Sequence, residues 1–235
     1  MQTHCQMVLS SRQVVDPTLT DSASPVATLD LAGLSFDKAP ILGAFHLSVM
    51  TGETIAILGP SGIGKTSLLR ILAGLETRFK GTRTVTASLA YVFQEPTLLP
   101  WRCVMDNITI PTGCDVTLAQ ERLEEVGLAD HADLFPDQLS LGQQRRLSLA
   151  RAFAAKPALL LMDEPFVSLD PSLVEEMLGV FERLRANHGT TTVFVTHAQT
   201  EATRLADRIL TLGGKPATIT REQGNQNDSA PAGRD

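Results

Sequence analysis

The sequence has few cysteines, no long hydrophobic run and no excess of basic residues, and each absence argues against a class of protein. Its three cysteines (Cys5, Cys103 and Cys114) lack metal-ligand spacing, and the odd number suits reduced thiols in a cytosol. Apolar runs such as residues 158–162 are far too short to cross a bilayer. The 20 basic and 26 acidic residues leave a net charge of −6, which gives no electrostatic reason to expect nucleic acid as a partner.

The two ends of the chain differ from its middle. Residues 1–27 are polar, carry Pro17 and Pro25, and have no basic and apolar signal-peptide pattern, so we expect a mobile arm. The composition of residues 221–235 predicts a disordered tail. The chain is 43% apolar and 20% charged, which is typical of a globular protein with a sizeable core. We therefore expect one domain over residues 28–220, linked to any membrane through a partner.

Apolar strands alternate with helical segments along this domain. Half-buried or buried strands are predicted at 29–36, 46–50, 53–59, 89–94, 158–163 and 191–197. Helical spacing is found at 65–75, 117–127, 143–155, 173–186 and 198–206. Such alternation predicts an α/β fold with a mostly parallel sheet covered on both faces. Residues 97–142 interrupt the alternation with mostly helical material, so we expect a helical subdomain inserted there.

Residues 59–66 (GPSGIGKT) match the spacing G-x-x-x-x-G-K-[ST] between an expected strand and an expected helix. The glycines let backbone amides close around phosphate groups without Cβ clashes. Lys65 supplies a mobile cation for the β- and γ-phosphates, and the Thr66 hydroxyl can ligate Mg²⁺. The competing interpretation is a solvated glycine turn, and the flanking strand and helix favour a nucleotide site. The expected nucleotide contacts are Gly59, Pro60, Ser61, Gly62, Ile63, Gly64, Lys65, Thr66 and Ser67.

Asp163 and Glu164 follow a buried strand, at the end where open α/β sheets place their ligands. Adjacent carboxylates beside an apolar run are unfavourable unless a cation or hydrogen bonds compensate. Mg²⁺ on a nucleotide would supply that cation to Asp163, and Glu164 could accept a proton from a water that attacks the γ-phosphate. Taken alone, such a pair is more often ordinary polarity at the end of a strand. Behind a phosphate loop, the functional interpretation is favoured.

Residues 139–146 (LSLGQQRR) precede an apolar, alanine-rich helix. Ser140 and Gln143 have capping-box spacing, in which the serine oxygen accepts from the amide three residues on and the glutamine reaches back. A helix start also presents unpaired amides and the positive end of the helix dipole, so the same residues could hold an anion. The residues alone leave both interpretations open.

The order of these motifs resembles the ATPase subunit of ABC transporters over about residues 28–220. The phosphate loop is followed by Gln94, LSLGQ, LLLMDEP, Ser168-Leu169-Asp170 and then His197. This resemblance implies a P-loop NTPase core with a small N-terminal antiparallel β part and the inserted helical subdomain. It also implies ATP hydrolysis by a homodimer, in which the signature loop (LSLGQ) of one copy caps the ATP held by the other.

The same resemblance implies a role for each matching residue. Gln94 resembles the residue that contacts Mg²⁺, His197 the one that holds the γ-phosphate and the attacking water, and Asp170 an aspartate across the dimer. Phe36 resembles the aromatic that stacks on adenine, and it fits a core position of its strand equally well. The implied catalytic residues are Glu164, His197, Lys65 and Gln94, and the implied Mg²⁺ ligands are Thr66, Gln94 and Asp163. Ser140, Gly142 and Gln143 would contact the partner's ATP.

Residues 94–101 (QEPTLLPW) resemble importer ATPases that serve nitrate, sulfonate, taurine and related solutes. Leu98, Leu99 and Trp101 form an apolar group that fits a contact with a membrane subunit, and for Trp101 packing inside the subdomain fits equally well. The implied partners are ATP, a second copy, a transmembrane permease and a solute-binding protein, at the cytoplasmic face of the inner membrane. The alternatives are a soluble mechanical ATPase and a module that binds nucleotide without hydrolysis, and the acidic chain and intact Glu164 and His197 argue against them.

Two departures from the family pattern stand out. Leu141 occupies the place of the first of two glycines in the signature loop, and a positive φ there would cost about 1–3 kcal/mol. With an ordinary φ, the leucine would only crowd the interface. Residues 76–93 form a shorter segment than the family usually has before Gln94, so we expect the antiparallel strands there to be trimmed.

Overall fold

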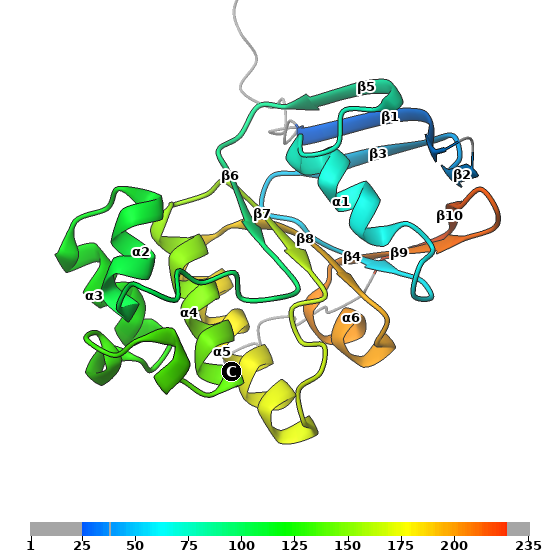
Figure 1. The fold of residues 1–235 in the computed structure, drawn as a ribbon. Helices are drawn as coiled ribbons and strands as arrows, with labels where there is room; N and C mark the ends of the chain where they lie inside the picture. The colour runs from blue at the N-terminus through cyan, green and yellow to red at the C-terminus, as the bar shows by residue number, and fades with distance from the viewer. Residues whose placement is uncertain (1–24, 38, 225–235) are drawn as a thin grey trace, which may run out of the picture.

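The computed structural model describes residues 25–37 and 39–224, which form two β-sheets and a set of helices (Figure 1). The first sheet is antiparallel. Its long strand β1 (Pro25–Phe36) pairs with β2 (Ala39–Leu42), β3 (Phe45–Met50) and β5 (Phe79–Val85). This sheet is the small N-terminal antiparallel part that the family resemblance implies, and β5 is its contribution from residues 76–93.

The second sheet is mostly parallel, with the strand order β10-β9-β4-β8-β7-β6. Its strands are β4 (Thr54–Leu58), β6 (Leu89–Val92), β7 (Leu159–Asp163), β8 (Thr191–Thr196), β9 (Arg208–Gly213) and β10 (Thr218–Gly224). Strands β4, β7 and β8 are buried at every position, as their continuous apolar sequences require. The prediction of an α/β fold is confirmed, while β2, β5, β9 and β10 were not among the predicted strands.

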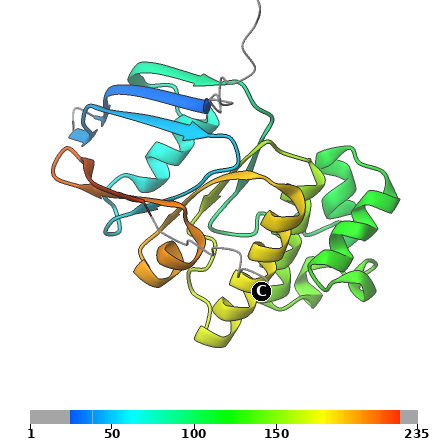
Figure 2. The same cartoon turned by 180° about the vertical axis from the view of Figure 1, so that it is seen from behind.

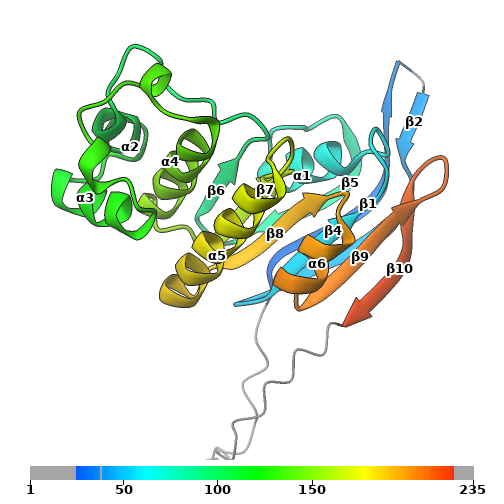
Figure 3. The ribbon, with the colours of Figure 1, turned by 90° about the horizontal axis from the view of Figure 1, so that it is seen from below.

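Helices cover both faces of the second sheet. Helix α1 (Lys65–Ala73) lies between the two sheets, and α5 (Pro171–His188) and α6 (Gln199–Leu205) lie on the opposite face (Figures 1 and 3). Because side chains alternate along a strand, a central strand contributes side chains to the cores on both faces of the sheet. Ile55 and Ile57 of β4 pack in the core around α1, whereas Ala56 and Leu58 pack in the core around α5.

The helical part lies at one end of the molecule and the antiparallel sheet at the other (Figure 2). It contains α2 (Val104–Thr112), α3 (Val116–Glu125) and the short turns η1 (Ala129–His131) and η2 (Pro136–Gln138). Helix α4 (Leu141–Ala154) packs against both α2 and α3. The subdomain predicted at about residues 97–142 is therefore confirmed as helical, and α4 extends it toward β7.

The predicted arm and the predicted tail both include residues that belong to strands. Strand β1 begins at Pro25 and Ala27 is buried, so the last three residues of the predicted arm 1–27 belong to the sheet. Residues 221–224 of the predicted tail pair with β9 as part of β10. The rest of the arm and tail lies outside the described residues. No helix in the described part of the chain has the length and apolar character needed to span a membrane.

Candidate nucleotide-binding site

The phosphate loop joins the buried strand β4 to helix α1. Gly62 and Gly64 have φ angles of 76° and 111°, which L side chains rarely adopt, and a Cβ on Gly64 would lie 2.8 Å from Leu42. Gly64 also caps α1, and no side chain bonds to the first amides of the helix. The loop therefore presents free N–H groups at the positive end of a helix, which is a suitable place for phosphate.

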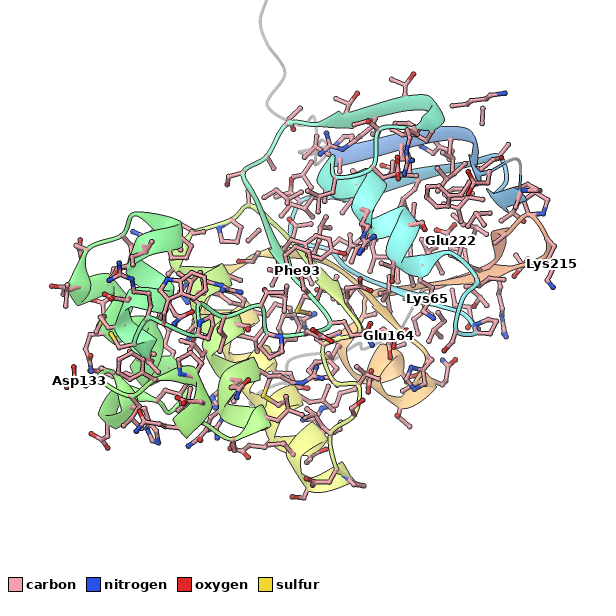
Figure 4. All side chains as sticks on the ribbon, in the orientation of Figure 1. Lys65, Phe93, Asp133, Glu164, Lys215 and Glu222 are labelled. Atoms are coloured by element: carbon pink, nitrogen blue, oxygen red, sulfur yellow. The ribbon has the colours of Figure 1, made fainter. Side chains whose placement is uncertain are left out.

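Lys65 is held at the base of this loop. Its Nζ donates to the carbonyl oxygens of Gly59 (2.9 Å) and Pro60 (3.2 Å) and lies 3.3 Å from Oε1 of Glu164. The side chain is 4% exposed, and Figure 4 shows it pointing toward Glu164. A buried ammonium with a single carboxylate neighbour is a strong site for a further anion.

Asp163, the last residue of β7, contacts two hydroxyl groups. Thr66 donates to Oδ1 at 2.9 Å and Tyr91 donates to Oδ2 at 3.2 Å. Burial raises the pKa of the Asp163 carboxyl, while these two hydrogen bonds lower it. Burial and the nearby Asp163 charge also raise the pKa of Tyr91, so its hydroxyl stays a donor.

The residues around Asp163 fit a magnesium ion. Thr66 and Asp163 are already in contact and offer only oxygen atoms, which is the donor type that Mg²⁺ prefers. Gln94 lines the same cavity and can add an amide oxygen. Two or three protein oxygens suffice, because Mg²⁺ usually completes its shell with phosphates and water.

Glu164 and His197 meet at the carboxyl ends of neighbouring strands. Nδ1 of His197 lies 3.4 Å from Oε2 of Glu164, so the carboxylate stands between His197 and Lys65. Glu164 has a φ of 44°, a strained conformation for a residue with a side chain, and it is only 15% exposed. The turn that carries His197 is held by Glu201, which accepts from the Thr196 hydroxyl.

A cavity of about 370 Å³ opens above these groups. The phosphate-loop residues that line it are Ser61, Gly62, Gly64, Lys65, Thr66 and Ser67. Phe36, Ile41, Gln94 and Glu164 complete the lining. The structure thus brings the predicted phosphate loop, Gln94 and Glu164 together around one space. The predicted contacts Gly59, Pro60 and Ile63 do not line it, and Gly59 and Pro60 instead accept hydrogen bonds from Lys65 through their carbonyl oxygens.

Phe36 has both of the properties that its sequence position suggested. It packs at the edge of the core beside α1 and also lines the cavity. The Arg78 guanidinium lies over its ring, 5.2 Å from the centroid, and Glu76 pairs with that guanidinium. The aromatic ring is therefore supported beside a space where a nucleobase could stack.

The signature residues lie outside the cavity and satisfy one another. Ser140 Oγ accepts from the Gln143 amide (3.3 Å), and Gln143 Oε1 accepts from the Ser140 amide (2.8 Å). This capping box is the one that the spacing predicts, so the capping interpretation is confirmed. Asp170 likewise caps its own helix, α5, by accepting from two amides. None of these residues contacts the phosphate loop of the same chain through a hydrogen bond between described residues.

The two signature positions 141 and 142 have different constraints. Leu141 is the first residue of α4, lacks a positive φ and is 44% exposed, so it adds no backbone strain. Of the two alternatives, backbone strain at Leu141 is therefore excluded, and crowding of an interface between copies is the one that is left. Gly142 is buried, and a Cβ there would lie 2.7 Å from the Leu173 side chain. The Leu173 side chain thus packs directly over this glycine, and a larger residue would have to displace it.

The apolar group after Gln94 is divided between core and surface. Leu98 packs against the helical core, and the backbone of Leu99 is held by Asn107, whose Oδ1 accepts from the Leu99 amide at 2.7 Å. Trp101 is 69% exposed, so its packing inside the subdomain is excluded. A contact with another protein is the interpretation that remains for this side chain.

Sequence reasoning missed three residues that support the site. Tyr91 binds Asp163, Glu201 holds the turn of His197, and Arg145 donates to the loop that follows Glu164. Tyr91 is 72 residues from its partner, and nothing in its local sequence announces the contact. Glu201 gave a weak signal, because a carboxylate at a buried helical position requires a partner.

Comparison with known proteins finds close relatives along most of the chain. The aliphatic sulfonates import ATP-binding protein SsuB 2 of Pseudomonas syringae pv. tomato is 41% identical over 191 residues, which cover 80% of this chain and 82% of that protein. The aliphatic sulfonates import ATP-binding protein SsuB of Granulibacter bethesdensis is 43% identical over 191 residues, which cover 80% of each chain.

A solved structure and a family model agree with these relatives. The ATP-binding cassette MJ0796, described as a dimer in a post-hydrolysis state bound to ADP and Pi, matches with a TM-score of 0.74 and 27% identity, covering 85% of this chain and 99% of that one. The family model described as ABC transporter matches residues 42–167. Together with the phosphate loop and the Asp163–Glu164 pair, these similarities show that the chain belongs to the ABC transporter family, as an ATP-binding subunit that hydrolyses ATP.

Proposed function

We propose that the chain hydrolyses MgATP in this cavity, with a defined role for each group. The amides of the phosphate loop and Lys65 would bind the phosphates, and Thr66, Asp163 and Gln94 would hold Mg²⁺, which would supply positive charge beside the γ-phosphate. Glu164 accepts the proton of the attacking water, and His197 orients that water and the γ-phosphate. The observation that carries this proposal is the position of Glu164, within 3.4 Å of both Lys65 and His197.

A second copy of the chain completes the site. Ser140, Gly142 and Gln143 do not line this chain's own cavity, and the first turn of α4 has an exposed outer side at Ser140 and Leu141. The related cassette described above is a dimer. We infer that Ser140 and the amides near Gly142 contact the γ-phosphate held by the partner copy, with Asp170 also at the dimer interface.

The dimer can be trapped by removing the proposed base. In Glu164→Gln, hydrolysis should fall to a slow residual rate while the phosphate-binding groups persist, so ATP with Mg²⁺ should shift the protein from monomer to dimer in light scattering, and ADP should not. Adding Ser140→Arg should abolish that dimer and leave ATP binding to the monomer intact. A dimer that persists in the folded double variant would refute the shared site.

The solute is proposed to be a sulfonate. The relatives at about 40% identity are named for import of aliphatic sulfonates, and Trp101 offers an exposed contact for a membrane-embedded permease. The chain would then act as a peripheral subunit at the cytoplasmic face of the inner membrane, together with a permease and a solute-binding protein. No observation favours the alternative of a soluble mechanical ATPase.

Purification from native membranes tests this coupling. A permease and a solute-binding protein should co-elute with the chain and be identified by mass spectrometry, and alkanesulfonate with its binding protein should stimulate ATP turnover of the reconstituted complex. Trp101→Ala should weaken the co-elution. Ile110→Ala removes another exposed apolar side chain of the helical part and serves as the matched control. Equal co-elution of the two variants with the permease would contradict the role of Trp101.

A further inference from the structure

Arg145 joins helix α4 to the loop that follows Glu164. Its Nη1 donates to the carbonyl oxygen of Pro165 (2.7 Å), and its Nη2 donates to that of Val167 (2.6 Å). The residue is 7% exposed, and its Nε has no partner although it is buried. Burying a guanidinium is unfavourable, and here burial lowers the pKa of Arg145. The two directed hydrogen bonds to Pro165 and Val167 compensate part of that cost.

The loop that Arg145 holds, residues 164–168, is strained at both ends. Glu164 and Ser168 have φ angles of 44° and 61°, each an unfavourable conformation for a residue with a side chain. Few other bonds fix the loop: the Glu164 amide donates to Val195, and the Val167 amide donates to Glu164. The buried Phe166 side chain anchors the middle of the loop, and Arg145 holds the carbonyl groups on either side of it. We therefore expect loss of these two bonds to let the strained backbone at Glu164 relax.

Arg145 also lies on the same face of α4 as Gly142, three residues earlier. Gly142 packs against Leu173 at the start of α5, so this face of α4 contacts both the 164–168 loop and the next helix. The same first turn of α4 carries Ser140, the residue proposed to contact the partner's ATP. A rotation of α4 would therefore pull directly on the two carbonyl groups that flank Phe166 and so move the loop behind Glu164.

We propose that Arg145 is a positioning residue for ATP hydrolysis. It holds Glu164 in its strained backbone conformation and makes the position of that carboxylate depend on the orientation of α4. This inference rests on the proposed role of Glu164. Hydrolysis would then require α4 to keep its position against the 164–168 loop. This requirement links the Glu164 carboxylate of one copy to the contact that α4 of the same copy makes with its partner.

The test compares Arg145→Met, Arg145→Lys and the control Arg146→Met. Arg146 is the next residue of α4, and its contacts are with Val126 and Glu176, away from the loop. We expect Arg145→Met to lower kcat by about tenfold or more with KM for ATP changed less than about twofold, because the phosphate-binding groups are untouched. Arg145→Lys should recover part of the turnover, and Arg146→Met should keep the wild-type rate.

A double-variant cycle separates positioning from a general structural effect. If Arg145 acts through Glu164, Arg145→Met should not lower the residual turnover of Glu164→Gln any further. An equal fall in both backgrounds, or a wild-type rate in Arg145→Met, would overturn this inference and leave the proposed function intact. If Arg145→Met does not fold, the same cycle is run with Arg145→Lys. A wild-type protein without ATP turnover would instead overturn the proposed function itself.

Discussion

Helix α1 begins at the phosphate loop and α4 at the signature loop, but of these two helices only α1 begins with backbone N–H groups that no side chain binds. Gly64 caps α1 with no side-chain bond, whereas Ser140 and Gln143 form a complete capping box at the start of α4. A glycine cap leaves N–H groups for a ligand, and a capping box satisfies two of them within the chain. The first helix start is therefore a preformed anion site. The second is a stable, outward-facing turn, suited to a contact with another molecule.

The largest effect is expected from breaking the open helix start. Lys65→Ala removes the charge-assisted contact with phosphate, worth about 1.5–3 kcal/mol, so ATP affinity should fall about 10- to 100-fold. Titration calorimetry with the isolated protein measures it. Lys80→Ala, which removes an exposed lysine of β5, is the control. Unchanged ATP affinity in Lys65→Ala would contradict the assignment of the phosphate site.

Gly64→Ala tests why α1 has no side chain at its cap. A Cβ would lie 2.8 Å from Leu42 in a backbone with a φ of 111°, so unfolding free energy should fall by about 1–3 kcal/mol. Denaturant titration gives this value. Gly189→Ala, with a φ of 58° and no atom within 4 Å of the added Cβ, is the control for a left-handed position without a close contact. A loss in Gly64→Ala no larger than that in Gly189→Ala would contradict the strain expected at Gly64.

Ser140→Ala removes the cap of α4 and should lower the unfolding free energy by about 1 kcal/mol, because the Gln143 amide loses its acceptor. The expected ATP affinity of the monomer is unchanged, since Ser140 does not line the cavity. Thermal melting and nucleotide titration provide the two measurements. Weaker ATP binding by the monomer would mean that the two helix starts are not independent.

The smallest effect is expected from Leu141→Gly. Leu141 is an exposed first-turn residue without strain, so the change should cost no more than about 1 kcal/mol of stability through lost helix propensity. If the leucine crowds the interface between copies, the ATP-dependent dimer of Glu164→Gln should tighten in the Leu141→Gly background. Light scattering over a concentration series measures the strength of the dimer. A weaker dimer in the Leu141→Gly background would contradict crowding and show that the leucine makes a favourable contact.

The sequence was sufficient for features whose parts are contiguous. The phosphate loop and the Asp163–Glu164 pair are each set by one strand end and the loop after it, so their spacing carries the geometry. Contacts such as those of Tyr91 with Asp163 and Arg145 with Pro165 join segments brought together only by the sheet and by α4. Local patterns contain no trace of them.

The errors at the chain ends have physical causes. Pro25 suggested a break, yet proline is tolerated as the first residue of a strand because no ladder bond is lost there. The polar residues 221–224 suggested disorder, but they form the end of β10 at the edge of the sheet. Edge strands often carry charged side chains, so polarity alone does not distinguish them from a tail.

The helical part is joined to the sheet at two points that lie far apart. The chain enters the helical part through residues 93–103, which follow the carboxyl end of β6 and include Gln94. It leaves through residues 155–158, which precede the amino end of β7. We call these two segments the entry stem and the exit stem. Because β6 and β7 are parallel neighbours, the two stems are separated by the length of β7, about 17 Å for its five residues. A turn of the helical part about the exit stem as a pivot carries the entry stem through the wider arc. We would therefore expect a force on α2 or Trp101 from a partner to displace Gln94, which lines the nucleotide cavity.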